Sequence, residues 1–371
     1  MNPNLAILSQ RGLSTHVSRC CGYEFEDVLR KAFPGTRLYA PRLSPSIQAG
    51  LKVKARVAHT GSFGGIFDNV FAVEQADEHE VLLASMGNAR DLALLGAVKD
   101  WRRKSRYAIC WIHELWIGEI PRLRGMLRVL EQFDLVLCSL YYTAEKLREE
   151  LKGPDVIYLP PGVDTLGFAP VTEPSLRPID ITNLGKIAEA THKSLFQYVK
   201  RIDGFYFFDS EKGTREARSP SEHRFRYANI LKRSRYFLCH FAKVAFEDSG
   251  GQLEFGLRYF EGLAAGCVVL GSRQSRPDFD EYLGWKDSVI EMPFECPNAS
   301  EILQKLDRES DRLREISARN VRRSLERNDH VHRWQTIVDR LGLPHQYHMS
   351  RRQEQVECKL NEFEYPARHV V

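Results

Sequence analysis

The sequence predicts an α/β protein in which two parallel-sheet domains face each other across a cleft. Short apolar runs alternate with amphipathic helical stretches in the first half of the chain, and the same alternation resumes in the second half. A proline-rich segment separates the two halves. Strands that are apolar throughout are buried on both faces, as in a parallel sheet covered by helices. The length of 371 residues also suits two domains with separate cores.

The first half supplies the expected strands and helices of one such domain. The expected strands are residues 5–8, 81–84, 107–112, 135–138 and 156–159. The expected helices are residues 23–32, 91–103, 122–132 and 144–151. Each helix follows a strand, as the crossover connections of a parallel sheet require.

The segment after residue 159 breaks this alternation. It contains Pro160, Pro161, Pro170, Pro174 and Pro178 and has no hydrophobic periodicity. Proline-rich sequence without periodicity is typical of a linker between domains. We therefore expect the first domain to cover residues 1–170.

A second domain is expected over residues 171–343. Its expected strands are residues 179–184, 205–208, 236–239, 268–270 and 289–290. Its expected helices are residues 194–201, most of 299–325, and 331–341. The polar tail, residues 344–371, can pack back on the first domain. Ligands of parallel sheets bind at the loops that leave the carboxyl ends of the strands, so the cleft between the two sheets is the expected site.

The charge balance argues against a nucleic-acid-binding protein. Lys and Arg number 53 against 49 Asp and Glu, and a net charge of +4 is too small to predict that function. Basic residues do cluster at 101–106 and 308–327. Solvated helix faces are the simpler interpretation of these clusters, and weak contact with an anionic membrane or an acidic substrate is the alternative.

Cysteine usage and hydropathy bear on the compartment. The eight cysteines show no metal-ligand spacing, and several lie in apolar runs, which suits buried free thiols in a reducing compartment. No signal sequence is evident, and no apolar stretch approaches the ~20 residues needed to span a bilayer. We expect a cytoplasmic protein, with peripheral contact at the inner membrane face as a further option.

A glycine-bearing loop that enters a helix, residues 250–266, is the strongest indication of function. Its sequence is GGQLEFGLRYFEGLAAG, and an apolar strand at residues 267–270 follows it. Backbone N–H groups in such a loop can approach an anion, and the helix N-terminus favours phosphate. Glu261, in the second turn, can hold a vicinal diol such as a ribose. Together these features predict a site for a nucleotide diphosphate that carries a sugar.

Three segments, in this order, resemble the GT-B glycosyltransferases, in particular glycosyltransferase family 4 and its divergent relatives. They are a junction formed by residues 133–139, 158–164 and 168–170; a strand with a glycine-basic loop at residues 180–186; and the segment 250–266. The resemblance extends over about residues 80–340. It implies a GT-B-like fold of two Rossmann-like domains, with the nucleotide bound by the second.

The resemblance also implies roles for residues of the second domain. Glu261 is expected to hold the ribose, while the backbone amides of Gly256 and Leu257 meet the diphosphate. Lys186, which follows Gly185, is expected to act on the leaving β-phosphate as the glycosyl centre becomes oxocarbenium-like.

Two further basic residues are candidates for the same diphosphate. Lys193 is the expected second member of a basic pair with Lys186. Arg258 precedes the retained acid as in divergent relatives, and its alternative role is an ion pair with Glu254 or Glu261. No Asp-x-Asp pair lies at a strand end, so a metal-independent site is expected.

The chain departs from the family pattern at one position of the 250–266 segment. The family carries two acids eight residues apart, and counting back eight from Glu261 reaches Leu253. Glu254 is one residue out of register, so we do not assign it the role of the first acid. The sugar contact that this acid supplies in the family is left unassigned.

The first domain offers a polar pair at a strand end. His113 and Glu114 directly follow the strand at residues 107–112 and are expected to line the cleft as catalytic groups together with Lys186. A buried core histidine beside a surface carboxylate is the alternative. The loop at residues 10–14 follows the first strand and corresponds to the family's acceptor-side loop.

The expected activity is glycosyl transfer from a UDP or GDP sugar to an unidentified glycan, lipid-linked or small-molecule acceptor. The resemblance favours retention of configuration, no metal, and no cofactor besides the donor. A sugar-nucleotide epimerase of the same architecture is one alternative. A non-catalytic protein that kept the nucleotide pocket is another, and the missing first acid favours it.

Overall fold

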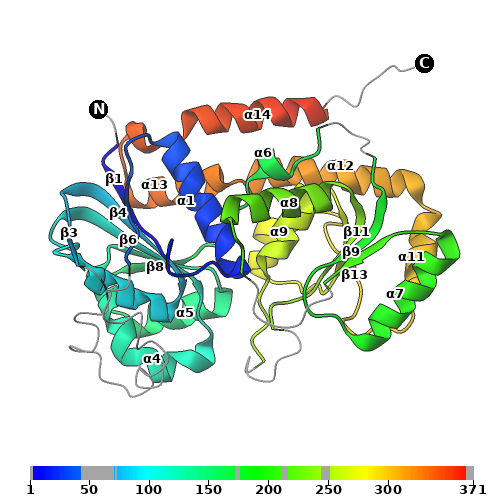
Figure 1. Cartoon of the computed structure of the whole chain (residues 1–371), viewed down its shortest axis with the longest axis horizontal. Helices are drawn as coiled ribbons and strands as arrows, with labels where there is room; N and C mark the ends of the chain where they lie inside the picture. The colour runs from blue at the N-terminus through cyan, green and yellow to red at the C-terminus, as the bar shows by residue number, and fades with distance from the viewer. Residues whose placement is uncertain are drawn as a thin grey trace.

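The computed structural model describes residues 3–42, 71, 73–171, 176–209, 216–243 and 251–364. Two parallel sheets lie side by side, each covered by helices (Figure 1). The first has six strands in the order β2-β1-β4-β6-β7-β8, and the second has five in the order β10-β9-β11-β12-β13. The α/β class and the two facing sheets therefore agree with the prediction from sequence.

The first sheet and its helices occupy most of the residues up to 168. The strands are β1 (Leu5–Leu8), β2 (Arg37–Tyr39), β4 (His79–Asn88), β6 (Ser105–Glu114), β7 (Leu135–Cys138) and β8 (Asp155–Tyr158). The helices are α1 (Cys20–Ala32), α4 (Ile120–Leu127), α5 (Tyr141–Glu150) and the short α6 (Thr165–Phe168). The 3-10 helices are η1 (Val17–Arg19), η2 (Ala89–Ala97), η3 (Ile117–Glu119) and η4 (Arg128–Gln132), and β3 (Glu74–Gln75) pairs with β5 (Val98–Lys99).

The register of the first sheet explains why its strands are apolar throughout. Ile7 lies opposite Leu83, and Leu8 lies opposite Ala84. Ile7 and Leu83 pack in one core layer, whereas Leu8 and Ala84 pack in the layer on the other face. Because helices cover both faces, neither set of alternating side chains meets solvent.

The α-helix expected at residues 91–103 does not form. The chain instead makes the 3-10 helix η2 and then the short strand β5. Asn88 caps η2 by accepting a hydrogen bond from the backbone N of Arg90, and the carboxylate of Asp91 accepts one from the N of Asn88 at 2.7 Å. The buried leucines of this stretch face the sheet in the tighter helix, so tertiary packing overrides the helical propensity.

The second sheet carries helices on both faces. Its strands are β9 (Ile179–Asn183), β10 (Tyr206–Phe208), β11 (Ser234–Cys239), β12 (Val268–Gly271) and β13 (Ile290–Glu291). Its helices are α7 (Glu189–Ile202), α8 (Pro220–Lys232), α9 (Leu257–Ala264), α10 (Pro277–Leu283), α11 (Ala299–Asp307) and α12 (Ser310–Arg327). The sequence prediction omitted α8 and α10. Both begin at a proline. Ser219 caps α8 because its Oγ accepts a hydrogen bond from the backbone N of Glu222 at 3.3 Å. A serine followed by a proline is typical of a helix N-terminus, so this start could have been predicted.

The C-terminal helices return to the first domain. In α13 (His330–Leu341), Trp334 and Ile337 pack in the same core layer as Phe25 of α1, so this helix packs on the first domain. The tail, expected to be polar and able to pack back on the first domain, forms η6 (His345–Tyr347) and α14 (Ser350–Glu364). The Tyr347 hydroxyl accepts a hydrogen bond from the N of Asn4 at 3.1 Å. Helix α14 lies over α12 and α6 along one side of the molecule (Figure 1).

The two basic clusters are neutralised by neighbouring acids. In residues 101–106 the ion pairs are Arg102–Asp134, Arg103–Asp100, Lys104–Glu78 and Arg106–Glu80. Along α12 they are Arg312–Asp287, Arg314–Asp311, Arg319–Glu315, Arg322–Glu326 and Arg323–Glu326. Along α12 this is the arrangement of a solvated helix face, whereas residues 101–106 form a turn and the start of β6 rather than a helix. Among the described helices, none has the length and apolar character that crossing a membrane requires.

Candidate functional site

A cavity of about 980 Å³ lies between the two sheets, and both domains line it. The first domain contributes residues that follow or end β1, β4 and β6, together with the start of α1. The second contributes residues after β9, β10 and β11, one face of α8, and the first turns of α9. The carboxyl ends of both sheets therefore meet at one cavity, as parallel topology predicts.

The N-terminus of α9 opens onto this cavity. Gly256 is the N-cap residue, no side chain caps the helix, and Gly256, Leu257 and Arg258 all line the cavity. A Cβ placed on Gly256 would meet no atom of the described residues within 4 Å, so these residues leave the side of the N-cap open. Unpaired amides at a helix N-terminus carry partial positive charge and favour an anion.

The loop after β9 brings Gly185 and Lys186 beside Arg258. Gly185 has φ +115°, which favours glycine, and any side chain there would collide with the Arg258 guanidinium. Lys186 and Arg258 both line the cavity. Within the described part of the chain, the exposed Arg258 side chain has no hydrogen-bond or ion-pair partner. Its charge is therefore available to a ligand at the start of α9.

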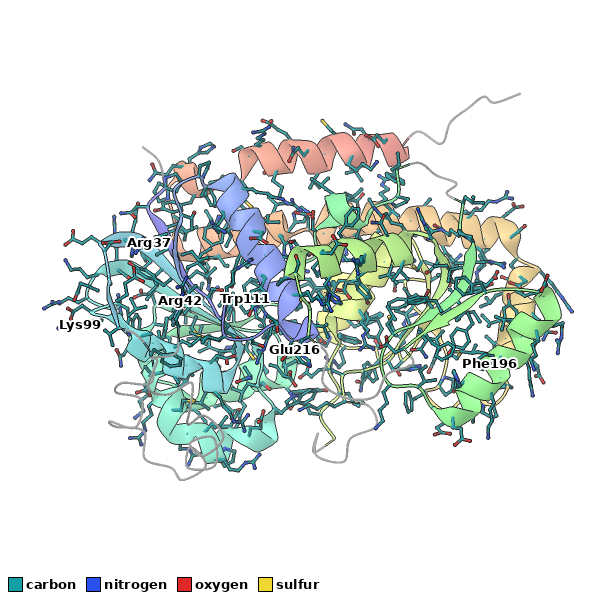
Figure 2. All side chains as sticks on the ribbon, viewed as in Figure 1. Arg37, Arg42, Lys99, Trp111, Phe196 and Glu216 are labelled. Carbon is teal, nitrogen blue, oxygen red and sulfur yellow. The ribbon has the colours of Figure 1, made fainter. Side chains whose placement is uncertain are left out.

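The structure does not place Lys193 at this site. Lys193 lies on α7, is 71% exposed, and forms an ion pair with Glu189 of the same helix at 2.5 Å. It is absent from the cavity lining, and Figure 2 labels Phe196, one turn further along, at the outer edge of the second domain. The position of Lys193 therefore gives no support to its predicted diphosphate contact, since its ammonium group pairs with Glu189 on the same helix.

Glu261 is held inside the cleft by an arginine that sequence reasoning missed. Its side chain is 3% exposed and lines the cavity, and its Oε1 accepts a hydrogen bond from Nη1 of Arg224. The alternative ion pair between Arg258 and Glu261 is not formed. Arg224 lies on the unpredicted helix α8 within a charged stretch, HRFR, which resembles an ordinary solvated helix face in sequence.

Glu254 serves a different purpose from the family's first acid. Its buried carboxylate accepts hydrogen bonds from the backbone N of Tyr141 at 3.0 Å and of Tyr142 at 3.1 Å, the first two residues of α5. The Nε2 of Gln252 also donates to it, at 2.7 Å. Burial raises the pKa of Glu254 although these bonds and Arg276 oppose the shift. Glu254 therefore caps a first-domain helix from the second domain.

Replacing Glu254 with alanine is expected to lower the free energy of unfolding by about 3 kcal/mol, because two backbone N–H groups and the Gln252 amide lose a buried acceptor. Thermal unfolding checks this, with Glu145→Ala, an exposed acid of the same helix paired with Arg148, as the control that changes stability little. Unchanged stability in Glu254→Ala would contradict the capping role.

His113 presents an unpaired ring nitrogen toward the cavity. Its Nδ1 lies 3.4 Å from Oγ of Ser139, which itself accepts a hydrogen bond from Nε1 of Trp111 at 2.8 Å. The Ser139 hydroxyl is therefore free to donate to Nδ1, which leaves the proton of the neutral ring on Nε2. Nε2 is buried without a partner among the described residues, and a Cβ on Gly22 would lie 3.7 Å from it.

The imidazole of His113 is neutral near pH 7. Burial, assisted by the nearby Arg19, lowers the pKa of His113 to about 3. The ring is therefore a weak base and a potential N–H donor to a bound hydroxyl group.

Glu114 lies at the rim of the cavity, where other groups engage it. Its Oε1 accepts a hydrogen bond from Nε1 of Trp116 at 2.9 Å and lies 3.5 Å from Nζ of Lys243. Lys243 also lies 4.4 Å from the centroid of the Trp116 ring. Both partners line the cavity, so Glu114 takes part in a contact between the domains.

The loop at residues 10–14, which the resemblance places on the acceptor side, is tied to α1. Arg11 pairs with Glu26 at 2.7 Å and with Asp27 at 2.9 Å, and Oγ of Ser9 donates to Glu26 at 2.8 Å. Burial raises the pKa of Glu26 to about 7, against the opposing effect of Arg11. Gln10 and Glu26 line the cavity. The loop is therefore a fixed part of the cleft wall.

The described residues around the cavity do not form a metal-binding site. Over the ranges that the structure describes, no group of three or more His, Cys, Asp or Glu side chains is placed to hold a metal ion. The cations that line the cavity on the second-domain side are the side chains of Lys186, Arg224, Arg226, Lys243 and Arg258.

Comparison with known proteins identifies part of the chain and its fold. Residues 204–339 match the family model described as glycosyl transferase-like, a span that includes Arg224, Arg258 and Glu261. The structure is similar to that of HepE from Anabaena in complex with UDP-glucose, with 13% identity, a TM-score of 0.51, and coverage of 91% of this chain and 99% of that one. A second HepE structure, in complex with UDP, gives 12% identity, a TM-score of 0.51, and coverage of 92% and 100%. No curated protein matches the chain. At such identities the likeness establishes the fold, which is GT-B.

Proposed function

We propose that this GT-B chain, with its glycosyl transferase-like segment at residues 204–339, transfers a sugar from a nucleotide-diphosphate sugar to an acceptor. We further propose that the donor carries UDP or GDP, that the reaction proceeds with retention at the anomeric carbon, and that neither metal nor cofactor takes part. The acceptor is a glycan, a lipid-linked sugar or a small molecule bound from the first-domain side. The similar HepE protein has been solved with UDP-glucose and with UDP.

One observation carries the proposal: a free cation, an open helix N-terminus and a buried carboxylate share one wall of the cavity. Arg258 and the amides of Gly256 and Leu257 supply positive charge for a diphosphate. Glu261 lies one helical turn further along α9, where it supports a ribose. A nucleotide diphosphate can contact both features at once.

The same groups favour departure of the diphosphate. Negative charge grows on the β-phosphate as the bond to the sugar breaks, so fixed positive charge there stabilises the transition state more than the ground state. Arg258 and the α9 amides provide it, with Lys186 at the same edge of the cavity. In this proposal His113 donates its Nε2 proton, which has no partner among the described residues, to a sugar hydroxyl and so orients the ring.

Retention is favoured because the carboxylates that line the cavity from the described part of the first domain are already engaged by neighbouring groups. Glu26 is engaged by Arg11 and Ser9, and Glu114 by Trp116 and Lys243. The low pKa of His113 makes it a poor base near neutral pH. We therefore infer that the acceptor hydroxyl attacks from the side of the leaving group and passes its proton to a phosphate oxygen as the sugar–phosphate bond breaks.

Product analysis tests the proposal. The protein is incubated with UDP-sugars and GDP-sugars, with and without an acceptor panel, and NMR gives the anomeric configuration of any product. Transfer, or slow donor hydrolysis alone, with retained configuration is expected. Conversion of the donor sugar to its epimer without an acceptor would replace the proposal with an epimerase. Donor binding without any turnover would favour a non-catalytic binding protein.

A further inference from the structure

We propose that Arg224 is a positioning residue that ties the Glu261 carboxylate to the first domain through Glu24, so that recognition of the ribose depends on contact between the two domains. The inference rests on the proposed function, since it takes Glu261 as the ribose contact. It assigns a role to a helix, α8, that the sequence left unexplained.

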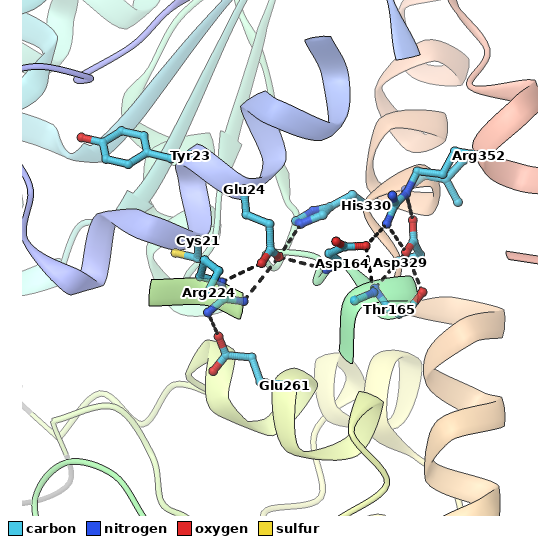
Figure 3. A network of polar contacts seen from close by, with 12 residues as sticks. Cys21, Tyr23, Glu24, Asp164, Thr165, Arg224, Glu261, Asp329, His330 and Arg352 are labelled. Carbon is cyan, nitrogen blue, oxygen red and sulfur yellow. Dashed lines mark hydrogen bonds and ion pairs between the residues drawn. The ribbon is translucent and has the colours of Figure 1, made fainter. Parts of the chain in front are cut away.

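The Arg224 guanidinium lies between two carboxylates from different domains (Figure 3). Its Nε donates to Oε2 of Glu24 at 2.6 Å and its Nη2 donates to Oε1 at 3.3 Å, a two-point contact with α1 of the first domain. Its Nη1 donates to Oε1 of Glu261 on α9. The Arg224 side chain is 9% exposed, Glu24 10% and Glu261 3%, so water does little to screen the three charges.

Arginine suits this position because its planar fork serves two carboxylates at once. The guanidinium carbon also lies 4.9 Å from the ring centroid of Phe168 and 5.6 Å from that of Tyr227, which fixes its plane. A lysine could place one ammonium group near the two acids but could neither pair with Glu24 at two points nor stack in this way. Arg224 is thus committed to protein groups rather than to a diphosphate.

Glu24 is itself anchored to the first-domain side of the cleft. Its Oε1 accepts hydrogen bonds from the backbone N of Asp164 at 2.9 Å and from Nε2 of His330 at 3.0 Å. Burial alone would raise the pKa of Glu24, but Arg224 and His330 outweigh it, and the pKa lies well below its usual range. The carboxylate is therefore ionised at neutral pH and holds the Arg224 guanidinium in a fixed position.

This anchoring orients the carboxylate of Glu261. Arg224 holds Oε1, which fixes the plane of the carboxylate against the wall of the cavity and leaves Oε2 for a ribose hydroxyl. Separation of the domains would move Glu24 away from Arg224. The first domain would then no longer hold the Arg224–Glu261 pair in a fixed position. Ribose binding and contact between the domains should therefore stabilise each other.

Discrimination between ribose and deoxyribose tests the inference. Affinities for UDP and 2′-deoxy-UDP, and for GDP and 2′-deoxy-GDP, are measured by calorimetry for the wild type and for Arg224→Lys, Glu24→Gln and Glu261→Gln. A hydrogen bond to a buried carboxylate predicts that the wild type prefers the ribonucleotide by about ten- to a hundredfold. Arg224→Lys and Glu24→Gln are expected to reduce this preference to about threefold or less, as Glu261→Gln does.

Arg276→Lys is the matched control. Arg276 is also buried, lies near two carboxylates, Asp278 and Glu254, and stacks on aromatic rings, but it does not line the cavity. Its replacement should lower thermal stability and leave the ribose preference unchanged.

Each outcome separates the inference from its alternatives. A preference that survives in Arg224→Lys overturns the positioning role. If Arg224→Lys lowers the affinities for the ribonucleotide and for its 2′-deoxy analogue equally, Arg224 contacts the diphosphate instead. A preference that survives in Glu24→Gln alone overturns the coupling between domains. If the wild type binds none of the four nucleotides, the proposed function fails before the role of Arg224 is reached.

Discussion

Replacing Glu261 with alanine is expected to abolish the thermal stabilisation that the donor gives the wild type. A donor at a hundred times its Kd stabilises the folded protein by about 2.7 kcal/mol, which raises Tm by on the order of 5 °C. The variant loses the carboxylate that supports the ribose, and Arg224 keeps only Glu24 as a partner. Differential scanning fluorimetry with UDP-sugars and GDP-sugars measures the effect.

The variant must be compared with its own ligand-free state, because loss of a buried ion pair lowers stability by itself. Glu261→Gln keeps the shape of the side chain and is expected to bind the donor weakly rather than not at all. Glu222→Ala, an exposed acid on α8 paired with Arg226, should bind the donor like the wild type. Donor stabilisation retained in Glu261→Ala would remove Glu261 from the site.

Replacing Arg258 with alanine is expected to lower the rate of transfer by about 10²- to 10³-fold, mostly in kcat, since its charge acts on the departing diphosphate. Arg258 is the cation that lies beside the α9 N-terminus and Gly185 without a partner in the described ranges. Steady-state transfer or donor-hydrolysis rates measure the effect, and Arg258→Lys should restore part of the rate because it restores the charge.

Arg226→Ala is the control for Arg258. Arg226 also lines the cavity, but it is 74% exposed and Glu222 already neutralises it at 2.6 Å. Its loss should change the rate only slightly. A similar loss in both variants would indicate a general electrostatic effect of the cleft, and an unchanged rate in Arg258→Ala would exclude the phosphate contact.

The architecture could be predicted from sequence because burial on both faces leaves continuous apolar strands. The strand expected at residues 135–138 is β7, residue for residue. The helix expected at residues 91–103 was wrong because local capping by Asn88 and Asp91 and packing of the leucines favour a 3-10 helix. Helix α8 was not predicted because polar residues interrupt its apolar face. Its N-terminus could have been predicted, since a serine followed by a proline is typical of a helix start.

The site was predictable where its parts are close in sequence. Gly256, Leu257, Arg258 and Glu261 belong to one loop and helix, so their shared surface follows from helical geometry. Their precise chemical roles stay predictions. Arg224 was not predictable, because its partners Glu24 and Glu261 are brought together only by the packing of α1, α8 and α9.

Two other positions show that contacts cannot be predicted from the spacing of residues in the sequence alone. Lys193 has a plausible distance from Lys186 in sequence, yet on α7 it pairs with Glu189 and does not line the cavity. Glu254 lies beside the expected acidic position, yet it caps α5 across the domain interface. In both cases the direction of a loop decides the contact, and residue spacing does not encode that direction.

A structure of the protein with UDP or GDP bound tests the central claim most directly. The account predicts the diphosphate at the N-terminus of α9 beside Arg258, with the ribose hydroxyls on the Glu261 carboxylate and the sugar end toward His113. A nucleotide bound outside the cleft, or one that places its base at α9 and leaves Glu261 paired only with Arg224, would contradict it.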